Sequence, residues 1–252
     1  MKLLYRIYQL FVALPILLFF TVLACLATII GCTVGKASFW NYWPAHIWSK
    51  LMCKVMLLPV RVEVRGHLND KQSYVYVANH QGPYDIFLVY GYLGRHFKWM
   101  MKKQLRNIPL VGKACESAGH IFVDKSGPKS IQKTYENARQ VLRGGTSLVV
   151  FPEGARTFTG HMGIFRRGAF QLADELQLPV VPVTIDGTFD VLPRQKGFNF
   201  LTWHPLRLVI HEPIMPHGQG SEDIKQVMNE SYNVIMQALP EKYQGYVENL
   251  DQ

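Results

Sequence analysis

The sequence has few cysteines, and they are not spaced in pairs. Four occur among its 252 residues, at Cys25, Cys32, Cys53 and Cys115, and no two form a CxxC pair. A zinc cluster built on such pairs is therefore not expected, and we predict no metal site. Unpaired thiols are typical of a reducing compartment, so we interpret all four as free.

Charge is missing from one long stretch near the start of the chain. The 29 residues from 7 to 35 include no Asp, Glu, Lys or Arg, and the segment 1–36 has no acid. As a helix this run would be about 43 Å long, which exceeds the roughly 30 Å hydrocarbon core of a bilayer. No small-residue cleavage site follows cleanly, which argues against a removed signal peptide. We therefore expect a membrane anchor, which Pro15 could kink.

Aromatic residues gather directly after this run, in the segment 38–58. Three of the five tryptophans lie there, and such rings favour the membrane–water interface. Apolar residues recur at helical spacing after Pro44, with Lys50 and Lys54 on another face. Two interpretations remain open: a helix in the interface with its cations toward lipid phosphates, or an amphipathic helix packed on the core. We expect residues 1–58 to form the anchoring helices, either as a hairpin-like anchor or as a membrane span followed by an interfacial helix.

Residues 59–252 have the pattern of one α/β domain. Short apolar runs predict strands at 60–64, 74–78, 97–101, 120–123, 147–151, 180–185 and 206–210. Helical periodicity separates several of them, at 84–93, 128–142, 167–177 and 221–238. Strands that alternate with helices indicate a largely parallel mixed sheet flanked by helices. The expected fold class is therefore α/β, with an N-terminal helical membrane anchor.

The chain is basic, with 27 Lys and Arg against 18 Asp and Glu. A moderate excess of positive charge favours anionic partners such as phosphate substrates, acidic membrane surfaces or nucleic acid. Nucleic-acid binding would explain the charge but not the long uncharged run, so we do not expect it.

The segment VANHQGPYDIF, 77–87, joins a predicted strand to a predicted helix. His80 follows the strand, and Asp85 comes five residues later, after a turn at Gly82 and Pro83. A carboxylate so placed can accept a hydrogen bond from one imidazole nitrogen and leave the other as a general base. Taken singly, Asp85 also fits an ordinary helix-terminal acid, and His80 a loop or core histidine. The segment has no Ser or Cys, so the nucleophile can be a substrate hydroxyl.

A second polar loop follows the predicted strand 147–151. FPEGARTF, 151–158, places Glu153, Gly154 and Arg156 in a tight turn. Arginine offers planar, multidentate donors suited to phosphate. The alternative is a surface turn with a solvated arginine.

Several blocks together resemble the 1-acyl-glycerol-3-phosphate acyltransferases and their glycerolipid relatives. The similar blocks are NHQGPYD (N-H-x4-D), GHIFVDK at 119–125 (G-x-x-F-I-D-R), FPEGART (F-P-E-G-T-R-S), VVPVTI at 180–185, MKKQLRNIPLVG at 101–112 and FRRGAF at 165–170. Their order and spacing agree with the family over residues 60–215. One block would be weak evidence, but four principal blocks in order are specific.

The resemblance implies a membrane-bound O-acyltransferase that makes phosphatidic acid. His80, assisted by Asp85, would take the proton of the sn-2 hydroxyl of 1-acyl-glycerol 3-phosphate. The oxygen would then attack an acyl thioester of CoA or of acyl-carrier protein. The expected partners are thus a lysophospholipid, an acyl thioester and membrane lipids, and no bound cofactor is implied.

The resemblance also implies which residues hold the substrate. The residues expected to bind the glycerol phosphate are Glu153, Gly154, Arg156 and Lys125, with Lys102, Lys103 and Arg167 as further phosphate contacts. Lys125 stands where the family usually has Arg, and Ala155 stands where it has Thr or Ser. The first change loses the bidentate fork and the second loses a hydroxyl, so both can shift the choice of acceptor.

Alternatives remain for the function and for the location. The acceptor can be glycerol 3-phosphate or another lysolipid, and a (thio)ester hydrolase or a non-catalytic lipid-binding protein can share the fold. Arg156 argues mildly against a hydrolase, and the pairing of His80 with Asp85 argues against a binding module. We expect a membrane protein with a cytosol-facing site. A bacterial inner membrane fits the compact size, and a eukaryotic organelle is the alternative.

Overall fold

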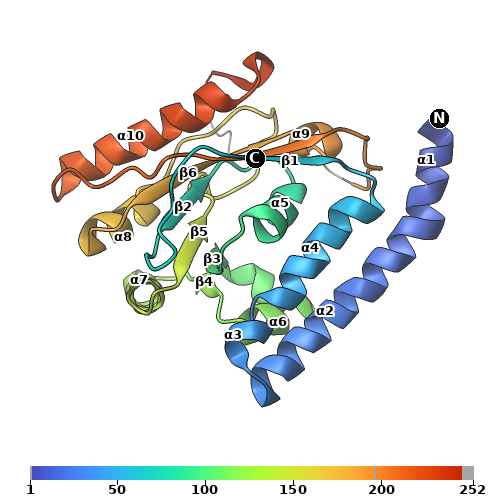
Figure 1. Ribbon diagram of the computed structural model, residues 1–252, viewed down its shortest axis with the longest axis horizontal. Coiled ribbons are helices and arrows are strands. Elements are labelled where there is room, and N and C mark those ends of the chain that lie inside the picture. Colours follow the sequence, from blue (N-terminus) through green and yellow to red (C-terminus); the bar gives the residue numbers. More distant parts are fainter. Residues whose placement is uncertain (1, 196, 246–252) are drawn as a thin grey trace.

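A seven-stranded mixed sheet forms the centre of the structure, a computed structural model that describes residues 2–195 and 197–245 (Figure 1). The strands are β1 (Val60–Val64), β2 (Val75–Ala78), β3 (Phe97–Lys102), β4 (Ile121–Val123), β5 (Ser147–Val150), β6 (Val180–Asp186) and β7 (Leu206–Ile210). Their order in the sheet is β1-β7-β6-β2-β5-β3-β4. Strands β2 to β6 are mutually parallel, β7 is antiparallel to β6, and β1 is parallel to β7. The predicted α/β fold with a largely parallel mixed sheet is confirmed.

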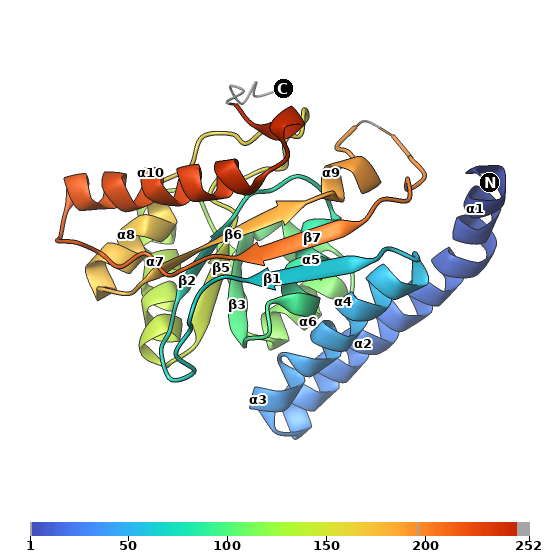
Figure 2. The ribbon, with the colours of Figure 1, turned by 45° about the horizontal axis from the view of Figure 1, so that its top comes forward.

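Helices cover both faces of this sheet (Figure 2). The helices of the domain are α5 (Tyr84–Tyr92), α6 (Val111–Ser117), α7 (Pro128–Arg143), α8 (Gly168–Leu176), α9 (Thr188–Val191) and α10 (Ser221–Ala238), with 3-10 turns η2 (Lys103–Asn107) and η3 (Glu241–Tyr243). Helices α7, α8 and α10 pack on one face and α5 on the other. The four predicted helices are present, whereas α6 and α9 have too few residues to show a periodic pattern.

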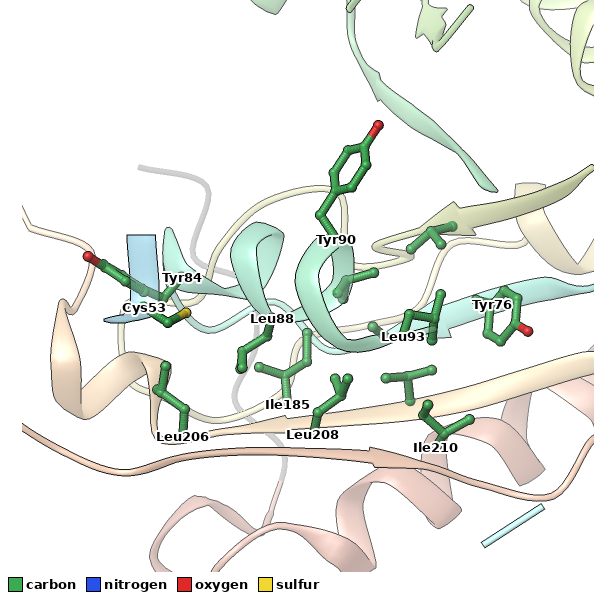
Figure 3. Packing of buried hydrophobic residues seen from close by; sticks show 14 of the residues in the cluster. Cys53, Tyr76, Tyr84, Leu88, Tyr90, Leu93, Ile185, Leu206, Leu208 and Ile210 are labelled. Carbon is green, nitrogen blue, oxygen red and sulfur yellow. The ribbon is translucent and has the colours of Figure 1, made fainter. Parts of the chain in front are cut away.

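Strand β2 shows how the two faces are built. Val75 and Val77 pack among residues of α7, α8 and α10, whereas Tyr76 and Ala78 pack toward α5, and all four are fully buried. Burial on both faces explains why this strand is a continuous apolar run rather than an alternating one. Figure 3 shows the α5 face, where Leu88 points toward Ile185 and the neighbouring strand residues.

The N-terminal segment forms a helical hairpin, which we define as residues 2–55. Its elements are α1 (Lys2–Tyr8), the π-helical turn η1 (Gln9–Ala13), α2 (Leu14–Val34), α3 (Ala37–Trp40) and α4 (Trp43–Val55). The π turn ends just before Pro15, which has no N–H to donate to the carbonyl four residues earlier. By length and composition, the helix Lys2–Val34 is able to cross a membrane.

Helix α4 lies between α2 and α5 (Figure 1). Ser49 and Cys53 are fully buried, and the backbone of Gly91 in α5 approaches the chain at Ser49 and Lys50 closely. The ammonium group of Lys50 lies 5.6 Å from the ring centre of Tyr92. Of the two arrangements expected for this segment, the structure therefore has the amphipathic helix packed on the core.

Hydrogen bonds fix the first helix of the hairpin to α4 near its start and at its middle. The hydroxyls of Tyr5 and Tyr8 donate to main-chain carbonyls at the end of α4, at 2.7 and 2.6 Å. Halfway along, the indole N–H of Trp48 donates to Thr21 at 2.9 Å. At the far end, the ring of Trp40 packs on Gly31 so closely that a Cβ at Gly31 would overlap it. The helix is thus held along its whole length.

Candidate active site

The polar loops predicted from the sequence meet at one edge of the sheet. Strands β6, β2, β5, β3 and β4 are neighbours in that order and run in the same direction. The carboxyl ends of parallel strands are where α/β proteins place ligands. His80 follows β2, Glu153 follows β5 and Lys125 follows β4, so all three loops lie at that edge.

His80 and Asp85 form a hydrogen-bonded pair. Nδ1 of His80 lies 2.6 Å from Oδ2 of Asp85, and the side chains are 15% and 0% exposed. A carboxylate only accepts hydrogen bonds, so Nδ1 carries the proton and Nε2 presents its lone pair. No residue in the described part of the chain hydrogen-bonds to Nε2. The pair therefore has the arrangement of a general base and its orienting carboxylate.

Two further groups hold the carboxylate of Asp85 in place. The N–H of Gly82 donates to Oδ2 at 3.0 Å, and the hydroxyl of Thr188 donates to Oδ1. Asp85 also lies in the first turn of α5, where the helix dipole favours negative charge. A Cβ at Gly82 would lie 2.6 Å from the carbonyl oxygen of Thr188, so only glycine lets the two segments approach this closely.

The imidazole of His80 is oriented by its neighbours in sequence and in space. The side chain of Asn79 exchanges two hydrogen bonds of 2.8 Å with the main chain of Ile185, which ties the end of β2 to β6. The ring of His80 stacks on Phe151 at 4.0 Å with an angle of 5° between the planes. Stacking on Phe151 and the hydrogen bond from Nδ1 to Asp85 therefore both limit rotation of the His80 ring.

Glu153 links the loop after β5 to the backbone of His80. Its two carboxyl oxygens accept N–H groups of His80 at 2.7 Å and Gly163 at 2.8 Å, and it is 1% exposed. Burial, together with the nearby charge of Asp85, raises the pKa of Glu153 to about 8 despite these two donors. Its role in the structure is to position the loop, and its predicted contact with substrate stays a prediction.

Lys125 is part of a group of three cations, which we call the lysine site: Lys102, Lys125 and Arg166. Burial, followed by the charges of Arg166 and Lys102, lowers the pKa of Lys125. None of the three forms an ion pair with an acid of the described residues. Gly154 has φ +78°, and an added Cβ would lie 3.1 Å from Nε of Arg166, so the predicted Gly154 makes room for this guanidinium. The site is suited to an anion.

Arg156 and Arg194 form a second group of cations, which we call the arginine site. Nη1 of Arg194 donates to the carbonyl of Arg156 at 2.7 Å, and its guanidinium carbon lies 3.9 Å from the ring centre of Phe158. Burial and the charge of Arg194 lower the pKa of Arg156, while Asp85 acts in the opposite direction. Within the described residues, neither guanidinium forms an ion pair with an acid. Arg156 is thus close enough to Asp85 to interact with it electrostatically.

Two residues that were predicted to contact phosphate, Lys103 and Arg167, lie outside the lysine and arginine sites. Lys103 forms an ion pair of 2.8 Å with Asp124, and Arg167 donates to the hydroxyl of Ser221 at 2.9 Å. Lys103 also lines a groove of about 640 Å³ between η2, β4 and α7, which neither His80 nor Asp85 lines. The residues before them belong to the lysine site: Lys102, which was also predicted, and Arg166, which was not.

Several residues that position the groups around His80 were not predicted from the sequence. Thr188 follows β6, Phe151 follows β5 within the FPEGART block, and Arg194 follows α9, and none has a recognisable spacing to His80. Asn79 carried a signal, because it directly precedes His80 in the N-H-x4-D block. For the other three, the contacts depend on how β6 and β5 flank β2, which the linear sequence does not display.

Comparison with known proteins agrees with this geometry. The family described as Acyltransferase matches residues 60–186, half of the chain. A chloroplastic 1-acyl-sn-glycerol-3-phosphate acyltransferase of Arabidopsis thaliana is 30% identical over 198 residues, which are 77% of this chain and 54% of that protein. The alpha enzyme of the same name from Ovis aries is 33% identical over 171 residues, 67% of this chain and 59% of that one. The chain thus spans little more than half the length of these relatives.

A solved structure extends the likeness beyond the matched segment. The crystal structure of the 1-acyl-sn-glycerophosphate (LPA) acyltransferase from Thermotoga maritima superposes with a TM-score of 0.73 at 25% identity, covering 92% of each chain. That coverage includes a large part of the N-terminal hairpin as well as the sheet. With the family match across β1 to β6 and the His80–Asp85 pair in place, the chain belongs to the acyltransferase family.

Proposed function

We propose that this protein moves an acyl group from an acyl thioester to the sn-2 hydroxyl of 1-acyl-glycerol 3-phosphate, giving phosphatidic acid. The observation that carries the proposal is the His80–Asp85 pair, whose Nε2 is unoccupied at an edge with two separate cation sites. The name and fold of the relatives support the same reaction.

The pair supplies the proton transfer that the reaction requires. Nε2 of His80 takes the proton of the acceptor hydroxyl while its oxygen attacks the thioester carbonyl carbon. The buried Asp85 stabilises the imidazolium that results. Collapse of the tetrahedral intermediate breaks the C–S bond, and the leaving thiolate receives the proton. A thiolate is a good leaving group, so no second strong acid is needed.

The two cation sites suit two phosphate-bearing substrates. The acceptor carries a phosphate monoester, and a CoA or phosphopantetheine donor carries phosphates of its own. Arg156 and Arg194 offer planar forks, and the lysine site offers three positive charges. The proposal needs no bound cofactor, because the thioester itself supplies the activated acyl group.

The N-terminal hairpin is the membrane-binding part of the proposal. From Ile7 to Val34 its outward residues are mainly apolar, and its inner side contacts α4, which packs on the domain. Because this inner side is bound at Tyr8 and at Thr21, we propose that the helix lies along the membrane surface rather than crossing it alone. The relatives include a chloroplastic and an animal protein, so family membership does not select a bacterial inner membrane.

The test is acyl transfer by the full chain in detergent or vesicles. Labelled acyl-CoA is offered with 1-acyl-glycerol 3-phosphate, glycerol 3-phosphate or lysophosphatidylcholine, and free fatty acid is measured alongside. We expect label in phosphatidic acid, and a loss of about 100-fold or more in kcat for His80→Ala. Label only in free fatty acid would indicate a hydrolase, and full activity of His80→Ala would refute the mechanism.

A further inference from the structure

We propose that the segment 198–203, between α9 and β7, is a second membrane-contact surface, which binds the lipid headgroup region beside the N-terminal hairpin. The inference rests on the membrane-binding part of the proposed function and adds to it a contact outside the hairpin. We call this segment, together with Leu57, the contact loop.

The contact loop is fastened to the first turns of the N-terminal helix. The side chain of Gln9 donates to the carbonyl of Leu201 and accepts its N–H, both at 2.9 Å. The guanidinium carbon of Arg6 lies 5.4 Å from the ring centre of Phe200. Because Gln9 is itself buried, this paired contact is a built connection rather than a chance surface contact. The loop therefore lies beside the first turns of the helix.

The loop presents large apolar side chains outward. Phe198 is 79% exposed, Trp203 is 55% exposed, and Leu57 is 56% exposed. The indole N–H of Trp203 donates to the carbonyl of Leu57 at 2.8 Å, so these two residues are neighbours. Leu57 also has φ +57°, a conformation that costs a leucine free energy. The exposure of the Leu57 side chain to water is unfavourable as well, and an apolar phase that covers it would remove this exposure.

Large apolar side chains are also exposed on the helix that adjoins the contact loop. The helix residues with large exposed apolar side chains nearest its start are Leu3, Leu4, Ile7, Leu10 and Phe11. Single exposed apolar residues are ordinary, but a continuous patch marks an interaction surface. Phe and Trp beside a cation such as Arg6 favour the headgroup region of a bilayer, where rings are buried and cations meet phosphates. Continuity with the hairpin selects a bilayer over a second copy of the chain.

The same stretch of chain leads into the active site. It starts just after Arg194, whose guanidinium lies over Phe158 and bonds to Arg156. At its other end, Thr202 donates its N–H to Val191 at the end of α9, the helix that begins with Thr188. The contact loop thus lies close in sequence to Arg194, one cation of the arginine site. We expect this connection to bring a lysolipid headgroup from the membrane surface toward Arg156.

The direct test is photolabelling of the full chain on vesicles of phosphatidylcholine and phosphatidylglycerol. A fraction of the lipid carries a diazirine close to its ester bonds, and labelled peptides are identified by mass spectrometry. We expect label in 197–203 as well as in the N-terminal helix, and a loss of at least fivefold in 197–203 for Phe198→Asp. Label confined to the hairpin would overturn the proposal, and so would a dimer that Phe198→Asp dissociates. This readout needs no activity, so it stands even if the proposed reaction fails.

A kinetic test follows the consequence for the substrate. We expect Phe198→Asp to raise KM for long-chain lysophosphatidic acid in vesicles at least fivefold, and to leave turnover of a water-soluble short-chain analogue within twofold. Phe198→Leu should behave as wild type, and Met215→Asp, an equally drastic change at a residue 51% exposed between β7 and α10, is the matched control. Equal loss on both substrates, or no loss on either, would contradict a membrane-contact role. Absence of any acylation by the wild type would instead count against the proposed function.

Discussion

The hydroxyl of Thr188, at the start of α9, donates a hydrogen bond to Oδ1 of Asp85, the oxygen that does not contact His80. The carboxylate therefore has a fixed donor on each side, and its plane cannot rotate away from the imidazole. Both Thr188 and Asp85 are fully buried, so water does not replace a lost donor easily. Thr188 acts on the reaction through Asp85, as a positioning residue.

Thr188→Val keeps the shape of the side chain and removes the donor. We expect kcat to fall about 10- to 100-fold, because a hydrogen bond to a buried charged group contributes about 1.5–3 kcal/mol. The loss should appear in kcat rather than in KM, since Asp85 then orients the His80 imidazole less well. Thr188→Ser restores the hydroxyl and should recover most of the rate. A Val variant with reduced stability but wild-type kcat would show a structural role alone.

Adjacent arginines offer a matched comparison for phosphate binding. Arg166 lies beside Lys125 and Gly154, whereas Arg167 reaches Ser221 at the start of α10. We expect Arg166→Ala to raise KM for one of the two phosphate-bearing substrates about tenfold or more, and Arg167→Ala to change it less than about threefold. Steady-state kinetics with each substrate varied in turn measure both. The reverse ranking would restore Arg167, the residue predicted from the sequence, as the contact.

His120 makes the stability of the fold sensitive to acid. Burial lowers its pKa to about 3, with a further contribution from Lys98. The N–H of Trp99 donates to Nδ1 at 3.2 Å, so Nε2 carries the proton and donates to the hydroxyl of Tyr90 at 3.0 Å. The folded state thus holds His120 neutral where the unfolded chain binds a proton.

The sign of this effect follows from linkage. The contribution of His120 is complete above its ordinary pKa of 6.5 and is lost as the pH falls from there toward 3. We expect the thermal midpoint of the wild type to drop between about pH 7 and about pH 5. His120→Gln should have a lower midpoint at neutral pH but a flatter dependence over this range. Parallel curves for the two proteins would assign the acid sensitivity to other groups.

The sequence was sufficient to predict those parts of the fold that depend on local pattern. All seven strands lie at the predicted places within one or two residues, because each is a short apolar run or, in β1, alternates valine with charged residues. The His80–Asp85 pair was also predictable, since a five-residue spacing across a strand–helix turn fixes the distance between the two groups. The place of α4 was left open, because Lys50 and Lys54 fit a lipid surface and a packed helix equally well.

Contacts between segments that are distant in sequence could not be predicted from local pattern. Thr188 reaches Asp85 because β6 is the neighbour of β2, and the strand order cannot be read from apolar runs. Arg166, rather than Arg167, faces Lys125 because the main-chain N–H of Arg166 bonds to Pro152 after β5, which sets the direction of both side chains. In a basic segment, adjacent cations look equivalent until one such backbone contact is known.

Gly82 provides the sharpest test of the active-site geometry. An added Cβ would lie 2.6 Å from the carbonyl oxygen of Thr188, a main-chain atom that cannot move without α9. Gly82→Ala should therefore separate α9 from α5, breaking the bond from Thr188 to Asp85, with a loss in kcat of about 100-fold and a thermal midpoint several degrees lower. Gly127→Ala is the control, because an added Cβ there meets nothing within 4 Å and its backbone is extended. If both variants retain wild-type kcat, the close packing of α9 on the turn at Gly82 is not required for catalysis.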